Sequence, residues 1–314
     1  MSDQTTPARI LGCDVGKETI VVFDSADGGT RSLPNTAQAL AAFAAELDET
    51  CLVICEATGG YEAALLDALA RAGRPAHRAD ARKVKAFIRS LGILGKTDAI
   101  DARALARYGH ERHDRLPLFQ PREEARRSLH TLVSTRSDLL AQRVACANRL
   151  AAPGAAPVAP HLRRILQALD AEIDAIQASL DDLIQAHAPL EQAVTTLRAI
   201  PGVGATTAAA LIAFMPELGS IDRRKAAALA GLAPHPRQSG RADAYRRTRG
   251  GRPQIKRILF MAALAARRHN PTLRAFYEKL RAAGKKPLVA ITALMRKIIV
   301  IANARLRNSN SQLS

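Results

Sequence analysis

Four acidic residues in the first third of the chain have the types and the spacing that a metal site requires. Asp14 lies in the run GCDVG, and Glu56 ends the apolar run CLVICE. A carboxylate beside a buried strand is costly unless something compensates its charge, and a metal ion does so. Asp98 and Asp101 lie three residues apart in KTDAIDAR, on one face of a helix start. Such oxygen ligands suit Mg²⁺ or Mn²⁺, although each acid alone is also explained as a cap, a turn residue or a surface charge.

A serine near the other end of the chain lies among arginines. Ser239 and Gly240 occur in APHPRQSGRADAYRRTRGGRPQIKR. A serine hydroxyl is a weak nucleophile without a base or a metal ion, and the nearest histidine, His235, is four residues away. From the local sequence alone, Ser239 is interpreted as a turn residue in a basic loop. The loop arginines are expected to hold a phosphate backbone; they are Arg237, Arg241, Arg246, Arg247 and Arg249.

The positive charge of the 314-residue chain, formally +17 at pH 7, lies in its last third. Residues 222–314 hold 22 lysines and arginines against 3 acids, whereas residues 1–221 hold 24 against 26. This distribution indicates a polyanionic partner, and nucleic acid before a membrane surface. The apolar run LVAITALMRKIIVIA is interrupted by Arg296 and Lys297 and is interpreted as too short to span a membrane.

The cysteines and histidines give no sign of a further metal site. The four cysteines form no CxxC pair, and the N-terminus shows no apolar signal region. These features predict a reduced cytoplasmic protein, associated with the nucleoid, without structural zinc. His110 and His113 lie three residues apart, but no third ligand is evident, so they are interpreted as surface or helix-end residues.

Strand and helix signals alternate through residues 8–90. RILGCDVGKETIVVFD predicts two strands, and further strands are predicted at RSLPN, CLVICEA and RPAHRAD. Helices are expected from Thr36 to Leu47, after Gly59-Gly60 to about Ala72, and over ARKVKAFIRSLG. A further helix is expected to be capped by Thr97 and to end at Gly109. Residues 1–122 are therefore predicted to form an α/β domain.

Helices follow to the end of the chain. Residues 123–192 are predicted to form two helices joined by the Pro-rich bend APGAAPVAP, as an antiparallel hairpin or a dimerisation arm. Apolar residues in the second helix repeat at spacings of four and three, which predicts a coiled-coil seam: Leu162, Leu166, Leu169, Ile173, Ile176, Leu180 and Leu183.

Residues 193–314 are predicted to form a helical C-terminal domain. Its first segment, LRAIPGVGATTAAALIAF, predicts a helix-hairpin-helix. Gly202 and Gly204 allow close approach of the backbone, and the following helix start can bind a phosphate. The alternative is a helix-helix turn with a structural role only.

Three blocks together, GCDVGKETIVV, CEATGGYE and GKTDAIDARALARYG, resemble the DEDD transposases of insertion-sequence family 110. The resemblance implies a RuvC-like, ribonuclease-H-fold domain in which Asp14, Glu56, Asp98 and Asp101 bind Mg²⁺. Lys96 and Thr97 belong to the third block without an implied catalytic role. The segment from residue 221 to about 299 resembles the family's second conserved domain. Within it, Ser239 is implied to be the nucleophile that joins covalently to a DNA phosphate.

The C-terminal segment departs from the family pattern in two places. Arg252-Pro253 follows Gly250-Gly251 where a less rigid residue is expected, and Phe260 stands where tyrosine is common. These departures put the local shape of the loop in question and leave the resemblance otherwise unchanged.

The resemblance implies a recombinase that cuts and rejoins donor and target DNA, guided by a noncoding bridge RNA. It also implies a dimer or tetramer, which the heptad seam favours. The alternatives are a ribonuclease-H-fold resolvase or nuclease that uses water, a non-catalytic protein that compacts DNA, and an actin-like sugar kinase. The kinase is disfavoured because a second glycine-rich phosphate turn is missing from the sequence.

Overall fold

The computed structural model describes residues 7–92, 95, 97–121, 123–234, 238–239, 242–243 and 248–311, with only the backbone given for 238–239, 242–243 and 310–311. The chain divides into two compact units, residues 1–122 and 123–314. The first predicted boundary coincides with this division. The second, between residues 192 and 193, falls inside the second unit, so a separate arm region stays a prediction.

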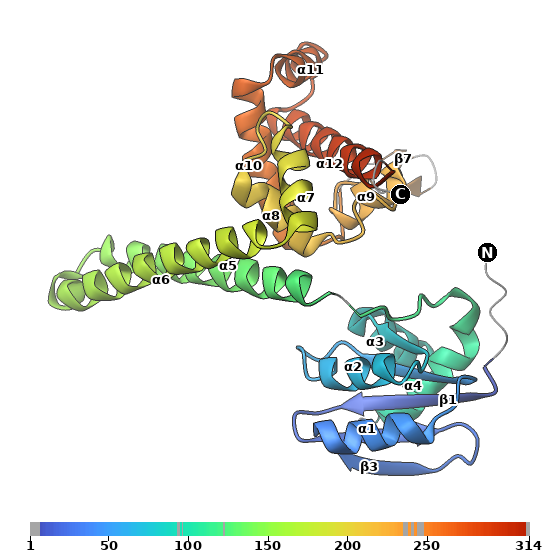
Figure 1. Cartoon of the computed structure of the whole chain (residues 1–314). Helices are drawn as coiled ribbons and strands as arrows, with labels where there is room; N and C mark the ends of the chain where they lie inside the picture. The colour runs from blue at the N-terminus through green and yellow to red at the C-terminus, as the bar shows by residue number, and fades with distance from the viewer. Residues whose placement is uncertain are drawn as a thin grey trace. The chain divides into compact units, whose positions relative to one another are not determined.

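A five-stranded sheet forms the centre of the first unit (Figure 1). In spatial order its strands are β3 (Thr30–Pro34), β2 (Thr19–Asp24), β1 (Arg9–Val15), β4 (Cys51–Glu56) and β5 (Ala76–Ala79). β2 is antiparallel to β1 and β3, whereas β1, β4 and β5 are parallel. The predicted strands are all present. β4 lies between two parallel neighbours and is covered on both faces, which explains its continuous apolar sequence.

Alternate residues of the strands face two helical layers, as the two-residue period of a strand requires. Leu11 and Cys13 pack with α1 (Ala37–Glu46) and α2 (Ala63–Arg71). Ile10 and Ile54 pack instead with α3 (Ala81–Ser90) and α4 (Asp98–Arg112). This mixed α/β unit is consistent with a ribonuclease-H-like domain of a DEDD transposase.

Helix α4 differs from its predicted extent. Gly109 does not end the helix, which continues to Arg112 and leads into the 3₁₀ turn η1 (His113–Arg115). A β-carbon at Gly109 would lie 2.6 Å from Cγ1 of Ile54 and 2.9 Å from Cγ2 of Ile10. The prediction was wrong because this glycine serves close packing of α4 on the sheet, which its local sequence does not reveal.

The second unit begins with two long helices that lie side by side (Figure 1). They are α5 (Glu124–Leu150) and α6 (Ala159–Gln185), joined through the 3₁₀ turn η2 (Ala156–Val158). The Arg143 side chain pairs with Asp170, and Sγ of Cys146 lies 3.6 Å from the Leu162 carbonyl, so the helices are antiparallel. The predicted seam residues of α6 are all buried or half-buried, whereas Ile165 beside them is 50% exposed.

This packing changes the interpretation of the heptad pattern. The seam of α6 lies against α5 of the same chain, so a partner chain is not needed to account for it. An antiparallel hairpin explains the apolar spacing within one molecule, and a coiled coil between chains stays a prediction.

The helices α5 and α6 together form the arm. The remaining helices gather at the end of the arm where α5 begins and α6 ends (Figure 1). They are α7 (Ala188–Arg198), α8 (Ala205–Phe214), α9 (Arg223–Leu229), α10 (Pro253–His269), α11 (Pro271–Ala282) and α12 (Pro287–Ser311). Leu129 and Val133 of α5 and Leu180 of α6 belong to the same apolar core as these helices. The base of the arm is therefore built into the C-terminal bundle.

Helix α12 is longer than the apolar run that suggested it. Residues Pro287–Ser309 are long and apolar enough to cross a membrane by length and composition alone. Several of its apolar residues are nevertheless buried in the bundle core: Ile291, Leu294, Met295, Ile298, Ile299, Ala302 and Leu306. Its Asn303 accepts a hydrogen bond from the Gly219 amide and donates one to the Ile221 carbonyl. These contacts are those of a core helix in the bundle.

Candidate active site

Asp14 and Glu56 lie next to each other at one edge of the sheet. Cys13 of β1 is opposite Cys55 of the parallel strand β4, so the acids that follow them are neighbours at the carboxyl ends of both strands. Both acids are half-buried. By strand alternation they share the sheet face of Ile10 and Ile54, which is the face that α4 covers.

The acidic start of α4 is directed to this same edge. A β-carbon at Gly12 would lie 1.9 Å from the Ala102 carbonyl oxygen, so the backbones of β1 and α4 are in direct contact there. Because Gly109 lies over Ile10 and Ala102 over Gly12, α4 runs opposite to β1. Its first turn, one turn before Ala102, therefore lies toward the end of β1 that carries Asp14.

Asp98 and Asp101 occupy that first turn. Thr97 caps the helix, as predicted, by accepting a hydrogen bond of 3.2 Å from the Ile100 amide. Asp98 is exposed and Asp101 is half-buried. Two strands and one helix start thus bring the four predicted acids to one edge of the first unit.

The donor set fits a hard divalent cation in kind, because Mg²⁺ and Mn²⁺ prefer carboxylate oxygens. Among the residues that the structure describes, however, no three His, Cys, Asp or Glu side chains come close enough to hold one ion together. The four acids are gathered at one edge and are not closed around a shared point.

A further carboxylate, Glu62, supports the loop that follows Glu56. Its side chain is almost fully buried. It accepts hydrogen bonds from the amides of Thr58 and Gly60, at 3.1 and 3.0 Å, and it pairs with Arg78 of β5. Burial alone would raise the pKa of Glu62, but backbone hydrogen bonds and Arg78 outweigh burial and lower it. Glu62 stands in the block CEATGGYE, yet sequence alone did not show that it holds the turn.

The cysteines and histidines outside this edge have structural surroundings. Cys13, Cys51, Cys55 and Cys146 are all free and buried. Burial raises the pKa of Cys55 to about 12, so its thiol stays protonated. His110 is exposed near the end of α4, and His113 follows that helix, in line with surface or helix-end residues.

The loop that carries Ser239 is closed at its base by backbone contacts. The Arg252 amide donates to the Leu229 carbonyl at 2.9 Å, and Pro234 pairs with Thr248 as a β-bridge. Gly231 and Gly251 both have positive φ angles, and a β-carbon on Gly251 would lie 2.1 Å from the Gly231 nitrogen. Only glycine permits this crossing of the two chain ends.

Arg252 adds a side-chain lock to the same loop. Its guanidinium binds both carboxylate oxygens of Glu217, at 2.8 and 2.6 Å, and donates to the Phe214 carbonyl at the end of α8. Pro253 is the first residue of α10, where proline is favourable. The Arg252-Pro253 pair, which stood out as a departure in the sequence, thus fixes the position at which the loop re-enters the bundle.

Ser239 ends the two-residue strand β6 (Gln238–Ser239), which pairs with β7 (Ala242–Asp243). Ser239 is opposite Ala242 in this antiparallel ladder. The side chain of Ser239 lies outside the described residues, as do Arg237, Arg241, Arg246 and Arg247 entirely. Arg249 is described and is exposed.

The predicted helix-hairpin-helix segment corresponds to α7, a turn and α8. Gly202 in this turn has a φ angle of +98°, and a β-carbon there would lie 2.6 Å from Cβ of Ala266 in α10. Gly202 therefore has a packing role that the sequence did not indicate. Gly204 is the N-cap of α8, with open space where a β-carbon would stand.

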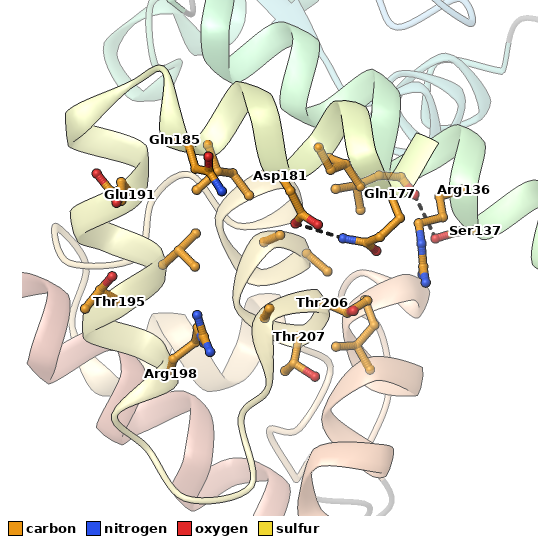
Figure 2. A pocket seen from close by; sticks show the side chains of 18 of the residues that line it. Arg136, Ser137, Gln177, Asp181, Gln185, Glu191, Thr195, Arg198, Thr206 and Thr207 are labelled. Atoms are coloured by element: carbon orange, nitrogen blue, oxygen red, sulfur yellow. Dashed lines mark hydrogen bonds between the residues drawn. The ribbon is translucent and has the colours of Figure 1, made fainter. Parts of the chain in front are cut away.

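A hollow of 580 Å³ lies beside the start of α8. Figure 2 shows Arg136 of α5 and Arg198 of α7 on two sides of it, with Thr206 and Thr207 of α8 between them. Nε of Arg136 is buried and has no hydrogen-bond partner among the described residues. Two acids, Asp181 and Glu191, also line the hollow, and their negative charges balance those of the two arginines.

Two family models match the chain. Residues 11–153 match the family model of DEDD transposases of IS110, described as a transposase. Residues 194–278 match the model of the transposase IS116/IS110/IS902 family. Together the two matches cover more than two thirds of the chain. The first contains the four acids, and the second contains Ser239 and the α7–α8 turn.

Individual relatives come from mobile elements and from a gene-inversion system. The chain is 35% identical over 153 residues to an uncharacterized protein of insertion element IS110 from Streptomyces coelicolor, and this alignment covers 48% of the chain and 37% of that relative. It is 28% identical over 264 residues to the pilin gene-inverting protein of Moraxella lacunata, covering 83% of the chain and 81% of the relative. An IS900 protein of Mycobacterium paratuberculosis is 32% identical over 49% of the chain and 38% of its own length.

Proposed function

Because the chain belongs to the IS116/IS110/IS902 family of transposases, we propose that it is a DNA recombinase that cuts and rejoins donor and target strands through a covalent bond to Ser239. The observation that carries this proposal is the placement of Asp14, Glu56 and the acidic start of α4 at one edge of a five-stranded sheet. A second unit of the same chain supplies the serine hairpin. A pilin gene-inverting protein among the relatives supports rejoining as well as cutting.

The four acids would hold Mg²⁺, with Mn²⁺ as a substitute, through their carboxylate oxygens. When bound, such an ion polarises a phosphate oxygen and lowers the pKa of an attacking group. The chain's own contribution is to hold the acids in place through close packing of α4 on β1 and through the turn that Glu62 supports.

In the proposed reaction, the Ser239 hydroxyl oxygen forms an ester bond with the phosphorus of the scissile phosphodiester. The bond from that phosphorus to the departing strand breaks, the hydroxyl proton is released, and the departing oxygen takes up a proton. The number of phosphate ester bonds is unchanged, so the reverse attack by a strand hydroxyl restores a phosphodiester. Exposed Arg249 and the loop arginines Arg237, Arg241, Arg246 and Arg247 would hold the phosphate backbone.

The turn between α7 and α8 is proposed as a second, sequence-independent backbone contact. The start of α8 offers amides that are not capped by a side chain. Gly204 leaves room for close approach, whereas Gly202 acts through its packing on α10. A noncoding bridge RNA that pairs with both DNAs is proposed as the guide, and sequencing RNA that copurifies with the chain tests this.

A suicide DNA substrate built from the junctions of the mobile element tests the covalent step. Wild-type protein with Mg²⁺ is expected to give an adduct on denaturing gels, and Ser239→Ala is expected to give none while still binding DNA. Ser179→Ala is a matched control, because Ser179 lies on the exposed side of α6. Asp14→Asn is expected to lose cleavage and adduct together.

The contrary outcome favours a different nucleophile. The DEDD name of the matched model points to acidic residues, which a nuclease or resolvase also uses with water. Cleavage that survives Ser239→Ala and leaves no adduct would establish that mechanism. Cleavage that survives both Asp14→Asn and removal of Mg²⁺ would exclude the acidic edge from the reaction.

A further inference from the structure

A large groove lies between α10 and α12, next to the base of the serine loop. It has a volume of 1370 Å³, which exceeds that of most small-molecule pockets, about 300–1,000 Å³. Pro234 and Thr248, the bridge pair that closes the loop, both line it. The α10–α12 groove therefore begins where the chain leaves the bundle for Ser239.

Much of the lining of the α10–α12 groove is apolar and open to solvent. Met261 is 64% exposed and Leu288 is 65% exposed, the largest exposed fractions among the chain's large apolar side chains that the structure describes. The ring of Phe260 and the side chain of Val289 are half-buried beside them. Large apolar side chains that gather in an open groove indicate a binding surface.

The charged residues that the structure describes along this groove are all basic. Lys256, Arg257, Lys286 and Arg296 line it, and none of the described lining residues is acidic. The hollow beside α8 differs, because two acids balance its two arginines. Charge complementarity therefore assigns a polyanion to the α10–α12 groove.

A ligand that pairs with the basic residues of the groove and also contacts its apolar residues must offer phosphates and flat apolar faces together. An unpaired nucleic-acid strand offers both, since its bases can stack on aromatic and apolar side chains while cations follow its backbone. A duplex keeps its base faces inside the stack. We infer that the α10–α12 groove holds the unpaired DNA strand that flanks the phosphate presented to Ser239. This inference rests on the proposed function, in which Ser239 joins to a DNA phosphate.

The test measures binding of full-length protein to two fluorescent probes in EDTA, so that cleavage plays no part. One probe is a 20-nucleotide oligodeoxythymidylate, and the other is an abasic DNA backbone of the same length. Met261→Ala with Leu288→Ala is expected to weaken binding of the first probe about tenfold, because the bases lose apolar contacts with both side chains, and to leave the abasic probe unchanged. Both residues are exposed, so the double variant retains its core.

Two matched variants complete the design. Lys286→Gln with Arg296→Gln is expected to weaken binding of both probes to a similar extent, because it removes phosphate contacts alone. Val144→Ala with Ile165→Ala alters apolar arm residues that are 56% and 50% exposed, and is expected to change neither. If the Met261/Leu288 variant lost the same affinity for both probes, the proposed contact of these two side chains with the bases would be overturned.

Other occupants give different results. If a 20-nucleotide oligouridylate binds more tightly than the DNA probe and alone loses affinity in the Met261/Leu288 variant, the groove belongs to RNA and the inference fails. If that variant binds DNA normally but lowers the mass measured by light scattering, the groove is a contact between copies of the chain. The covalent adduct assay is independent of these readouts, so failure of the groove and failure of the serine mechanism are distinguishable.

Discussion

The charge of a single residue, Glu62, makes the stability of the turn after Glu56 depend on pH. Its carboxylate ties Thr58 and Gly60 to Arg78 directly after Glu56. Because its pKa is lowered in the folded chain, its contribution is present above the unfolded value near pH 4.3 and is lost as the pH falls through the folded pKa. The turn beside the acidic edge should therefore loosen in acid.

Glu62→Gln is expected to lower the free energy of unfolding of the first unit by about 1–2 kcal/mol at pH 7, a value reduced because Arg78 is half-exposed. At pH 3 the difference between the variant and wild type should be smaller than at pH 7, because the contribution of a carboxyl with a lowered pKa declines below its unfolded pKa. Urea unfolding at both pH values measures this. Glu46→Gln, which removes an exposed pair with Arg31, is the control and should change either value by under about 1 kcal/mol. An equal loss of unfolding free energy at both pH values would contradict the proposed role of the Glu62 charge.

The placement of a residue could be predicted from the sequence where it follows from the residue's own element. Asp14 and Glu56 end apolar runs, and parallel strands bring such ends together, so their proximity could be anticipated. The partners of Glu62 and Arg252 could not, because Arg78 and Glu217 lie 16 and 35 positions away and their meeting depends on tertiary packing. The packing of Gly202 on Ala266 could not be predicted either, because the two residues are remote in sequence.

At the scale of elements, the contact between β1 and α4 decides where the acidic turn lies. Gly12→Ala would place a methyl group on the Ala102 carbonyl and near the Ala106 nitrogen. Backbone atoms cannot rotate away, so α4 must shift. We expect the first unit to lose about 3 kcal/mol of unfolding free energy or more, and DNA cleavage to fall with it.

Gly95→Ala is the matched control in the same unit. Its added β-carbon would meet Cδ1 of Ile100 at 3.4 Å, an ordinary contact. Chemical denaturation followed by circular dichroism compares the two variants with wild type. Stability in Gly12→Ala equal to that of Gly95→Ala would show that α4 does not depend on this close approach.

The heptad pattern of α6 does not reveal which helix packs against it. A heptad repeat specifies that one helix face is covered, and both α5 of the same chain and a second chain would satisfy it. The structure supplies α5, while Val144 and Ile165 remain exposed on the arm. The heptad pattern alone therefore does not determine whether the chain forms oligomers.

For the whole molecule, the concentration of positive charge in residues 222–314 predicts salt-sensitive binding. Each phosphate contact on a single strand adds about 0.7 to the slope of log affinity against log salt. Arg257→Gln with Arg296→Gln should lower that slope by about 1.4 if both contact phosphates. Arg163→Gln with Arg164→Gln, an equally exposed pair on α6, should leave it unchanged. Equal slopes for the two variants would place DNA away from the α10–α12 groove.

The closed base of the serine loop has an entropic consequence. Both ends of the segment are held before any DNA arrives, by the Gly231–Gly251 crossing, the Pro234–Thr248 bridge and the Arg252–Glu217 pair. Conformations excluded by these contacts need not be lost when a phosphate binds. The bundle therefore bears part of the ordering cost during folding, before DNA binds.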